Sequence, residues 1–151
     1  MREHNIAVRV SWKMVREEEY KYFEKANEPK TIYSICSQIL EGEPVENVIV
    51  VSLNTKLKIV GITTVSKGLL NSALIHSREV FRPAILANAA SIIIVHNHPS
   101  GDATPSTEDK NVDDRMREVG KLLEIPVIDN VIIGEKSYYS REIGRVLYED
   151  F

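Results

Sequence analysis

Two histidines two residues apart, followed shortly by a serine and an aspartate, are the residues of this chain best suited to chemistry. His96 and His98 come at the end of an apolar run, residues 91–95, that is typical of a buried strand. Side chains at i and i+2 of a strand point to the same face, so both imidazoles are expected to converge. Ser106 and Asp109, three residues apart at the head of a helical pattern, also share a face.

Two of these side-chain types, imidazole and carboxylate, are typical metal ligands. Two imidazoles and one carboxylate leave one position of a tetrahedral ion open, whereas structural zinc sites are usually closed by four ligands and are rich in cysteine. The sequence therefore predicts a catalytic Zn²⁺, one per chain, with His96, His98 and Asp109 as its ligands.

The segment between the histidines and the aspartate is rich in turn-forming residues. Pro99 favours an extended conformation for His98. Thr104 is expected to cap the next helix, with Pro105 in the first helical position, where a missing N–H costs nothing. A purely structural alternative stays open, because residues 106–109 also match a capping box and a histidine pair is often only hydrogen bonded.

The spacing of these residues (His-x-His, seven residues, Ser-x-x-Asp) resembles the JAMM signature of zinc metallopeptidases with the JAB/MPN fold. The neighbouring stretches 76–81 and 96–101 look like the RadC branch of that superfamily, and the similarity runs from residue 31 to residue 134. The resemblance implies a zinc-dependent peptidase. From the resemblance we expect the sequence to differ from full-length RadC proteins at its N-terminus, where there is no room for their helix-hairpin-helix region.

Strands that alternate with helices predict an α/β fold. The helical patterns cover residues 31–40, 77–88, 106–123 and 141–148. The strand patterns cover residues 48–53, 57–65, 91–95, 127–133 and 138–139. A hairpin between the first two strands makes the central sheet mixed, flanked by helices, and the resemblance implies the JAB/MPN, cytidine-deaminase-like architecture. We expect a charged N-terminal extension over residues 1–28 and the zinc-binding domain over residues 29–151.

Length and composition agree with one intracellular domain. The chain has 151 residues and a net charge of −3, which gives no global attraction to nucleic acid. It contains no apolar stretch of the roughly 18 residues that a membrane span needs, so we expect a cytoplasmic protein without membrane contact. Its single cysteine, Cys36, lies on the apolar face of a helix and is interpreted as a small buried hydrophobe. A homo-oligomer is compatible with open strand edges.

Amide hydrolysis also needs a general base, usually a carboxylate. In JAMM enzymes this is a glutamate upstream of the histidines, near the start of an early strand that follows the first helix. Glu46 fits that description and is our prediction. Glu79 is its rival, although the dipole of its own helix explains a carboxylate in the first turn. Glu41 and Glu43 compete less well, because the whole loop is acidic and a solvated loop explains them.

Other polar residues have weaker claims. The resemblance gives the Ser106 hydroxyl a role as donor to the oxygen that becomes negative in the tetrahedral intermediate. His76 is interpreted as a capping or surface residue. Asp113 orients a ligand or lies on a solvated helix face. Arg117 and its basic neighbours on the same helix form at most a modest strip, which is weak support for DNA binding.

Two classes of function follow. The first is a zinc hydrolase that cleaves a peptide or isopeptide bond in a peptide or protein substrate. The second is a non-hydrolytic zinc-binding accessory module in DNA repair or mobile-element biology. A base and Ser106 favour the first, because a purely structural metal needs neither. A zinc nucleoside deaminase expects His-x-Glu with Pro-Cys-x-x-Cys, which the sequence lacks.

Overall fold

The computed structural model describes residues 25–68 and 75–149, so most of the expected N-terminal extension lies outside the described residues. Within the described part, the helices are α1 (Pro29–Ile39), α2 (Ser77–Leu86) and α3 (Thr107–Leu123). The strands are β1 (Asn47–Leu53), β2 (Ile59–Lys67), β3 (Ser91–Asn97), β4 (Val127–Ile133), β5 (Ser137–Ser140) and β6 (Arg145–Tyr148). The predicted α/β class is confirmed.

The six strands form one mixed sheet in the order β2-β1-β3-β4-β5-β6. Strand β1 pairs antiparallel with both β2 and β3, and β4, β5 and β6 also follow one another in antiparallel pairs. Only the central pair β3–β4, among the described strands, is parallel. Helix α3 connects these two strands, as a parallel crossover requires.

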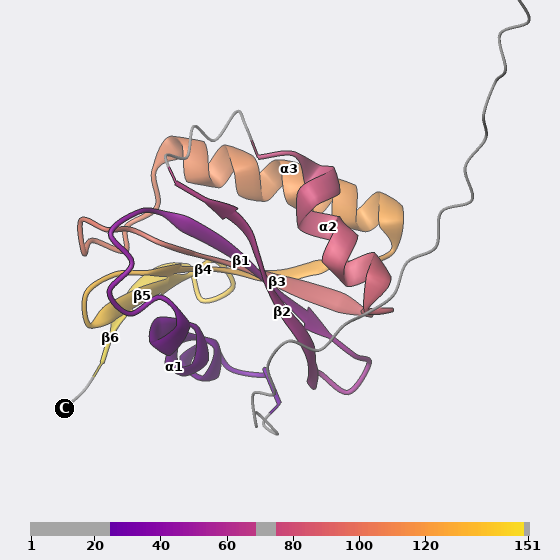
Figure 1. The fold of residues 1–151 in the computed structure, drawn as a ribbon, viewed down its shortest axis with the longest axis horizontal. Helices are drawn as coiled ribbons and strands as arrows, with labels where there is room; N and C mark the ends of the chain where they lie inside the picture. Colours follow the sequence, from indigo (N-terminus) through magenta and orange to yellow (C-terminus); the bar gives the residue numbers. More distant parts are fainter. Residues whose placement is uncertain (1–24, 69–74, 150–151) are drawn as a thin grey trace, which may run out of the picture.

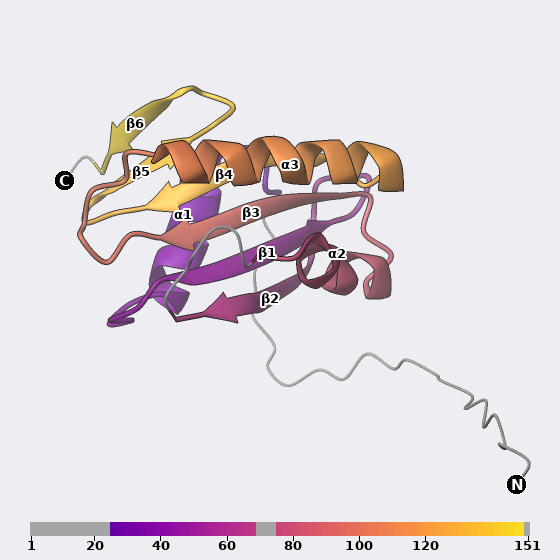
Figure 2. The same cartoon turned by 90° about the horizontal axis from the view of Figure 1, so that it is seen from above.

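Helices cover both faces of the sheet (Figures 1 and 2). Helix α1 packs on one face and α2 with α3 on the other, so the central strands β1 and β3 are buried throughout. Along β1, Ile49 and Val51 face α1, whereas Val48 and Val50 face α2 and α3. This two-sided burial explains the nearly continuous apolar sequence of both strands.

The predicted terminal helix over residues 141–148 is wrong. Residues Ser140 to Arg145 form a turn, and β6 then pairs antiparallel with β5. Gly144 lies in the turn with φ of +80°, a backbone conformation that a helix interior does not allow. The glycine in the middle of so short a segment therefore favours a hairpin over a helix.

Two further expectations concern the single cysteine and membrane-spanning helices. Cys36 is fully buried in the core between α1 and the sheet, as predicted, and burial raises its thiol pKa to about 12. Ala26 is also buried there, and its N–H donates to the Leu57 carbonyl at 2.9 Å. No helix in residues 25–68 and 75–149 has the length and apolar character to cross a bilayer.

Candidate metal centre

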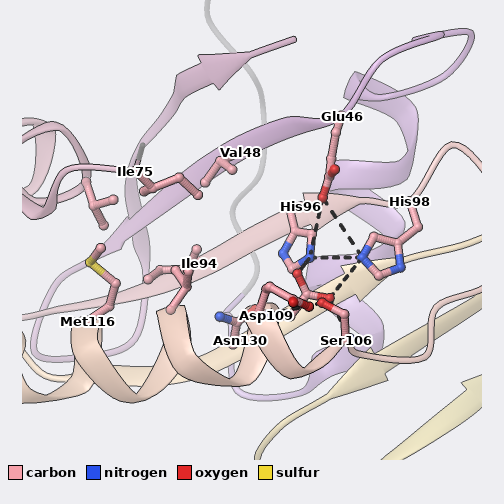
Figure 3. A pocket seen from close by; sticks show the side chains of 13 residues that line it. Glu46, Val48, Ile75, Ile94, His96, His98, Ser106, Asp109, Met116 and Asn130 are labelled. Carbon is pink, nitrogen blue, oxygen red and sulfur yellow. Dashed lines mark hydrogen bonds and ion pairs between the residues drawn. The ribbon is translucent and has the colours of Figure 1, made fainter. Parts of the chain in front are cut away.

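The two histidines occupy the carboxyl end of the central parallel strand. His96 pairs with Val48 of β1 and with Ile132 of β4, so its ring projects from the sheet on the side of α2 and α3. The His98 N–H continues the ladder by donating to the Ile133 carbonyl at 2.9 Å. Two-residue periodicity then directs both rings to one place, as Figure 3 shows.

Asp109 reaches the same place from the first turn of α3. Ser106 is the N-cap, and its Oγ accepts the Asp109 N–H at 3.1 Å. The Asp109 carboxylate accepts the Ser106 N–H at 2.8 Å in return. This reciprocal capping box fixes the Asp109 side chain against the helix end and leaves the Ser106 hydroxyl proton for another acceptor.

The prediction that Thr104 caps the helix with Pro105 in its first position is wrong by two residues. The Thr104 N–H donates to the Asp102 carboxylate at 2.9 Å, which keeps this segment in a turn. The capping box satisfies two backbone groups at Ser106 and Asp109, whereas a helix begun at Pro105 would forgo it.

The ligand atoms of His96, His98 and Asp109, hereafter the trio, match the spacing of a tetrahedral metal site. The two Nε2 atoms are 3.2 Å apart, and they lie 3.4 Å and 3.2 Å from the two Asp109 carboxylate oxygens. Zinc–ligand bonds of about 2.0–2.1 Å give ligand–ligand distances of roughly 3.3–3.4 Å. These spacings are compatible with a metal ion, and the described residues include a group able to hold one, which consists of the trio together with Glu46.

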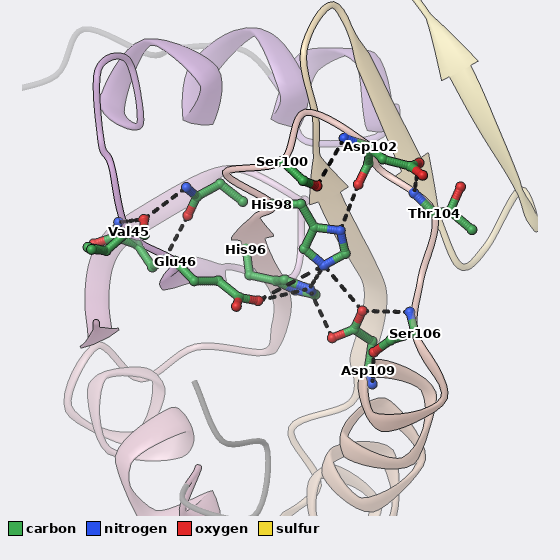
Figure 4. Close-up of polar contacts among 11 residues, drawn as sticks. Val45, Glu46, His96, His98, Ser100, Asp102, Thr104, Ser106 and Asp109 are labelled. Atoms are coloured by element: carbon green, nitrogen blue, oxygen red, sulfur yellow. Dashed lines mark hydrogen bonds and ion pairs between the residues drawn. The ribbon is translucent and has the colours of Figure 1, made fainter. Parts of the chain in front are cut away.

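The turn after β3 orients His98. Its Nδ1 lies 2.8 Å from the Asp102 carbonyl oxygen, which only accepts, so Nδ1 carries a proton and Nε2 is left to face Asp109 or a metal ion (Figure 4). The turn is packed against the loop after β4. Gly101 adopts φ of +87°, and a Cβ on Gly134 would lie 2.4 Å from the Gly101 oxygen. Glycine at position 134 therefore allows the close approach that supports the histidine turn.

Glu46 stands beside the trio at a longer distance. The Asn97 side chain accepts the Asn47 N–H at 2.7 Å and donates to the Val45 carbonyl at 3.1 Å, which ties the segment before β1 to the histidine strand. Glu46 Oε1 lies 4.0 Å from both imidazole Nε2 atoms. That distance exceeds the 3.2–3.4 Å of the trio, so Glu46 lies farther from the imidazoles than Asp109 does.

The electrostatics of the cluster are coupled. Burial raises the pKa of Glu46, although the nearby imidazoles oppose this. Burial also opposes ionisation of Asp109, but hydrogen bonds from both histidines and the Ser106 N–H outweigh it and hold the pKa well below its usual range. The hydrogen bond to Asp109 in turn raises the pKa of His98. The Asp109 carboxylate and the His98 imidazole thus stabilise each other's charged forms when no metal is bound.

The rival candidates lie elsewhere. Glu79 is in the first turn of α2 and pairs with Arg82 at 3.0 Å, which agrees with its structural explanation. Glu43 pairs with Lys67 at 2.9 Å. His76 is the exposed N-cap residue of α2 without a side-chain cap bond, as a surface residue would be.

Asp113 differs from both of its predicted roles, because it lies in a buried ionic cluster. Only 3% of this residue is exposed, and its carboxylate binds Arg117 at 3.1 Å and Arg141. Arg141 also binds Asp114 at 3.1 Å. We call Asp113, Asp114, Arg117 and Arg141 the arginine cluster. Arg117 therefore points inward, so the basic strip predicted on α3 loses a member. Sequence reasoning missed this cluster because Arg141 arrives from beyond β5.

A pocket of about 420 Å³ opens beside the trio (Figure 3). The trio, Glu46, Ser106 and Glu108 line its polar end. Apolar side chains line the remainder, and Asn130 lies between the pocket and Asp113, to which its Nδ2 donates at 3.3 Å. No periodicity of a single element predicts this wall, because it is assembled from strands and helices that are distant in sequence.

Comparison with known proteins gives one family and a set of similar bacterial and archaeal chains. The family model described as the RadC-like JAB domain matches residues 26–145. A Thermotoga maritima protein is 42% identical over 124 residues, which are 82% of this chain and 55% of the relative. A Methanosarcina barkeri protein is 44% identical over 116 residues, 77% and 51% of the two chains. Both are named only as UPF0758 proteins, and the chain spans about half of their length.

Proposed function

The chain belongs to the family of RadC-like JAB domains, and from this premise we propose that it is a zinc-dependent hydrolase of peptide or isopeptide bonds. One observation carries the proposal. Three ligand atoms stand 3.2–3.4 Å apart beside a pocket, and a fourth group, the Glu46 carboxylate, stands 4.0 Å from two of them. A structural metal has no use for such a neighbouring carboxylate.

His96, His98 and Asp109 are the residues that would hold the ion. Zinc bound there would supply Lewis acidity, which lowers the pKa of a water molecule in the open position and polarises a substrate carbonyl. The Asp102 carbonyl keeps His98 in the tautomer that presents Nε2. The capping box holds Asp109 in place.

Glu46 is proposed as the proton carrier. Burial raises the pKa of its carboxyl group, which makes the carboxylate a better acceptor for a proton from the attacking water. The carboxyl group can later release that proton to the leaving amine. The Asn97 bridge fixes the segment that carries it. The Ser106 hydroxyl is proposed to donate to the oxygen that becomes negative, because its cap bond uses it only as an acceptor.

Hydrolysis of peptide and isopeptide libraries by the zinc-loaded protein tests this proposal. We expect turnover by the wild type, a loss of about 10²-fold or more in Glu46→Gln, and unchanged rates in Glu79→Gln. Full activity in Glu46→Gln with loss in Glu79→Gln would show that the base is misassigned. Absence of turnover on every library would return the accessory-module hypothesis to first place.

A further inference from the structure

The pocket beside the trio has an apolar wall whose residues come from the elements that carry the polar groups. Strand β1 supplies Val48 two residues after Glu46, and β3 supplies Ile94 two residues before His96. Ile94 faces the same side as His96 because two residues are one strand period, and Val48 lies on that side because it pairs with His96 across the sheet. The wall therefore continues the metal centre instead of forming a separate groove.

Helix α3 extends this wall away from the trio. Val112 and Met116 follow Asp109 by three and seven residues, which places them on the same face of the helix. Ile75 and Val80, before and within α2, close the pocket opposite α3, as the labelled Ile75 and Met116 in Figure 3 indicate. The floor belongs to the core, because Val80 and Met116 are fully buried there.

The pocket thus has acidic groups and imidazoles at one end and six apolar side chains along the remainder. Its volume of about 420 Å³ lies in the range of roughly 300–1,000 Å³ that is typical of small-molecule sites. Glu108 lines the polar end, where its carboxylate disfavours an acidic group entering from solvent. A bond positioned at the trio places the neighbouring substituent against the apolar wall.

We propose that this pocket binds an apolar side chain of the substrate residue next to the scissile bond, so that the protein selects aliphatic or aromatic residues over acidic ones. The proposal rests on the proposed hydrolase function. Each buried methylene is expected to strengthen binding about fourfold, and a full-sized apolar side chain about 10- to 100-fold over a methyl group.

Binding of alkyl hydroxamates tests the pocket without hydrolysis, since a hydroxamate chelates a metal and carries its alkyl group into the adjoining space. Zinc-loaded Glu46→Gln protein is titrated calorimetrically with aceto-, butyro- and 4-methylpentanohydroxamate, and with a hydroxamate of similar length that ends in a carboxylate. We expect affinity to rise about fourfold per methylene and to fall for the carboxylate. A flat series, or no binding of any hydroxamate, would overturn the proposal.

Two valines on α3 provide a matched control. Val112 lines the pocket, whereas Val119, seven residues later on the same helix, lies outside it in the groove between α2 and α3. Val112→Phe should abolish the gain with chain length and leave acetohydroxamate binding intact, and Val119→Phe should keep the full series. Equal behaviour of the two variants would contradict the proposal. Ile75→Gln, at the partly exposed rim, should reduce the gain independently of any packing defect in α3.

The outcomes separate this proposal from the hydrolase itself. An affinity that rises with the length of the alkyl group, without turnover of any peptide, supports the apolar pocket and contradicts the hydrolase function. Turnover that does not depend on the residues flanking the scissile bond contradicts the pocket while the hydrolase stands.

Discussion

The trio and the arginine cluster are two partly buried groups of charges whose aspartates, Asp109 and Asp113, lie one helical turn apart on α3. Asp109 and Asp113 are both acidic residues on its inner side, yet their partners differ. Asp113 binds the guanidinium groups of Arg117 and Arg141, so the chain supplies its own cations. Asp109 binds two imidazoles and adjoins a pocket with a further carboxylate, Glu46.

This difference indicates which cluster binds a cation from solution. A buried carboxylate needs compensation, and permanently charged arginines provide it at every physiological pH. Imidazoles provide it only when protonated, and a metal ion replaces their protons. The arginine cluster therefore carries its own compensating charge, whereas the trio together with Glu46 could hold an ion from solution. Asn130 lies between the two, since it lines the pocket and donates to Asp113.

The largest effect that separates the clusters is the response to zinc. Excess zinc, at about 1,000 times its Kd, should stabilise the wild type by about 4 kcal/mol and raise its Tm by about 10 °C. Asp109→Ala should remove this response, because one of three ligands is lost, and Asp113→Asn should keep it. Thermal melts with and without zinc measure both. An equal response to zinc in the two variants would contradict the distinction between the trio and the arginine cluster.

A second prediction tests whether Glu46, beside the open side of the trio, carries a proton or binds the metal. Glu46→Gln should keep zinc and lose about 10²- to 10⁴-fold in hydrolysis, since a carboxamide cannot accept the proton. Steady-state rates and metal content of the same preparation check this. If zinc is lost together with activity, Glu46 acts as a ligand and the distance argument for its separate role fails.

Ser106 combines a cap with a proposed chemical role, and two substitutions separate them. Ser106→Ala should lower turnover by about 10²-fold and destabilise the protein by about 1 kcal/mol. Ser106→Asn restores a capping oxygen without the hydroxyl, so we expect stability to return while turnover stays low. Recovery of turnover in Ser106→Asn would mean that only the cap matters. Denaturation curves measure the stability of each variant, and steady-state rates measure its turnover.

Asp113→Asn tests the closed nature of the arginine cluster. Loss of a buried carboxylate leaves two partly exposed arginines without their partner, and we expect destabilisation of about 2 kcal/mol. Zinc content should stay at the wild-type value. Loss of zinc in this variant would show that Asn130 couples the clusters more tightly than the hydrogen bond suggests.

The smallest expected effect is a pH dependence confined to the trio. The hydrogen bond to Asp109 raises the pKa of His98, so in the metal-free protein its proton stabilises the fold fully below about pH 6.5, and this stability is lost as the pH rises through the raised pKa. Zinc replaces that proton, so stabilisation by zinc should grow between pH 6 and pH 8. Melts of both forms at several pH values measure it. A zinc effect that declines with rising pH would contradict the sign.

Periodicity and spacing predicted most of the fold and the convergence of His96, His98 and Asp109 on one place. The apolar run before His96 reads as a buried strand because both faces of β3 are covered. Patterns within one element do not show partners from distant elements. The sequence therefore leaves the partners of Asp113 open, and only the folded chain reveals Arg141 beside it.

Other features of the fold and the site also could not be predicted from patterns within one element. The Asn97 bridge joins residues about 50 positions apart, and nothing near Asn97 signals it. Strand β6 and the turn before it fit the pattern of a helix over residues 141–148, because apolar residues over eight positions are compatible with both periods. The position of the Ser106 cap was offered only as an alternative, since two overlapping cap signals stand side by side in the sequence.

Elemental analysis of purified protein, wild type beside His98→Ala and prepared without chelators, tests the central claim most directly. The account predicts about one zinc per chain in the wild type and little in the variant, because removal of one imidazole opens the trio. Absence of metal from both proteins, or the same metal content in both, would contradict it and make His96 and His98 ordinary hydrogen-bonded histidines.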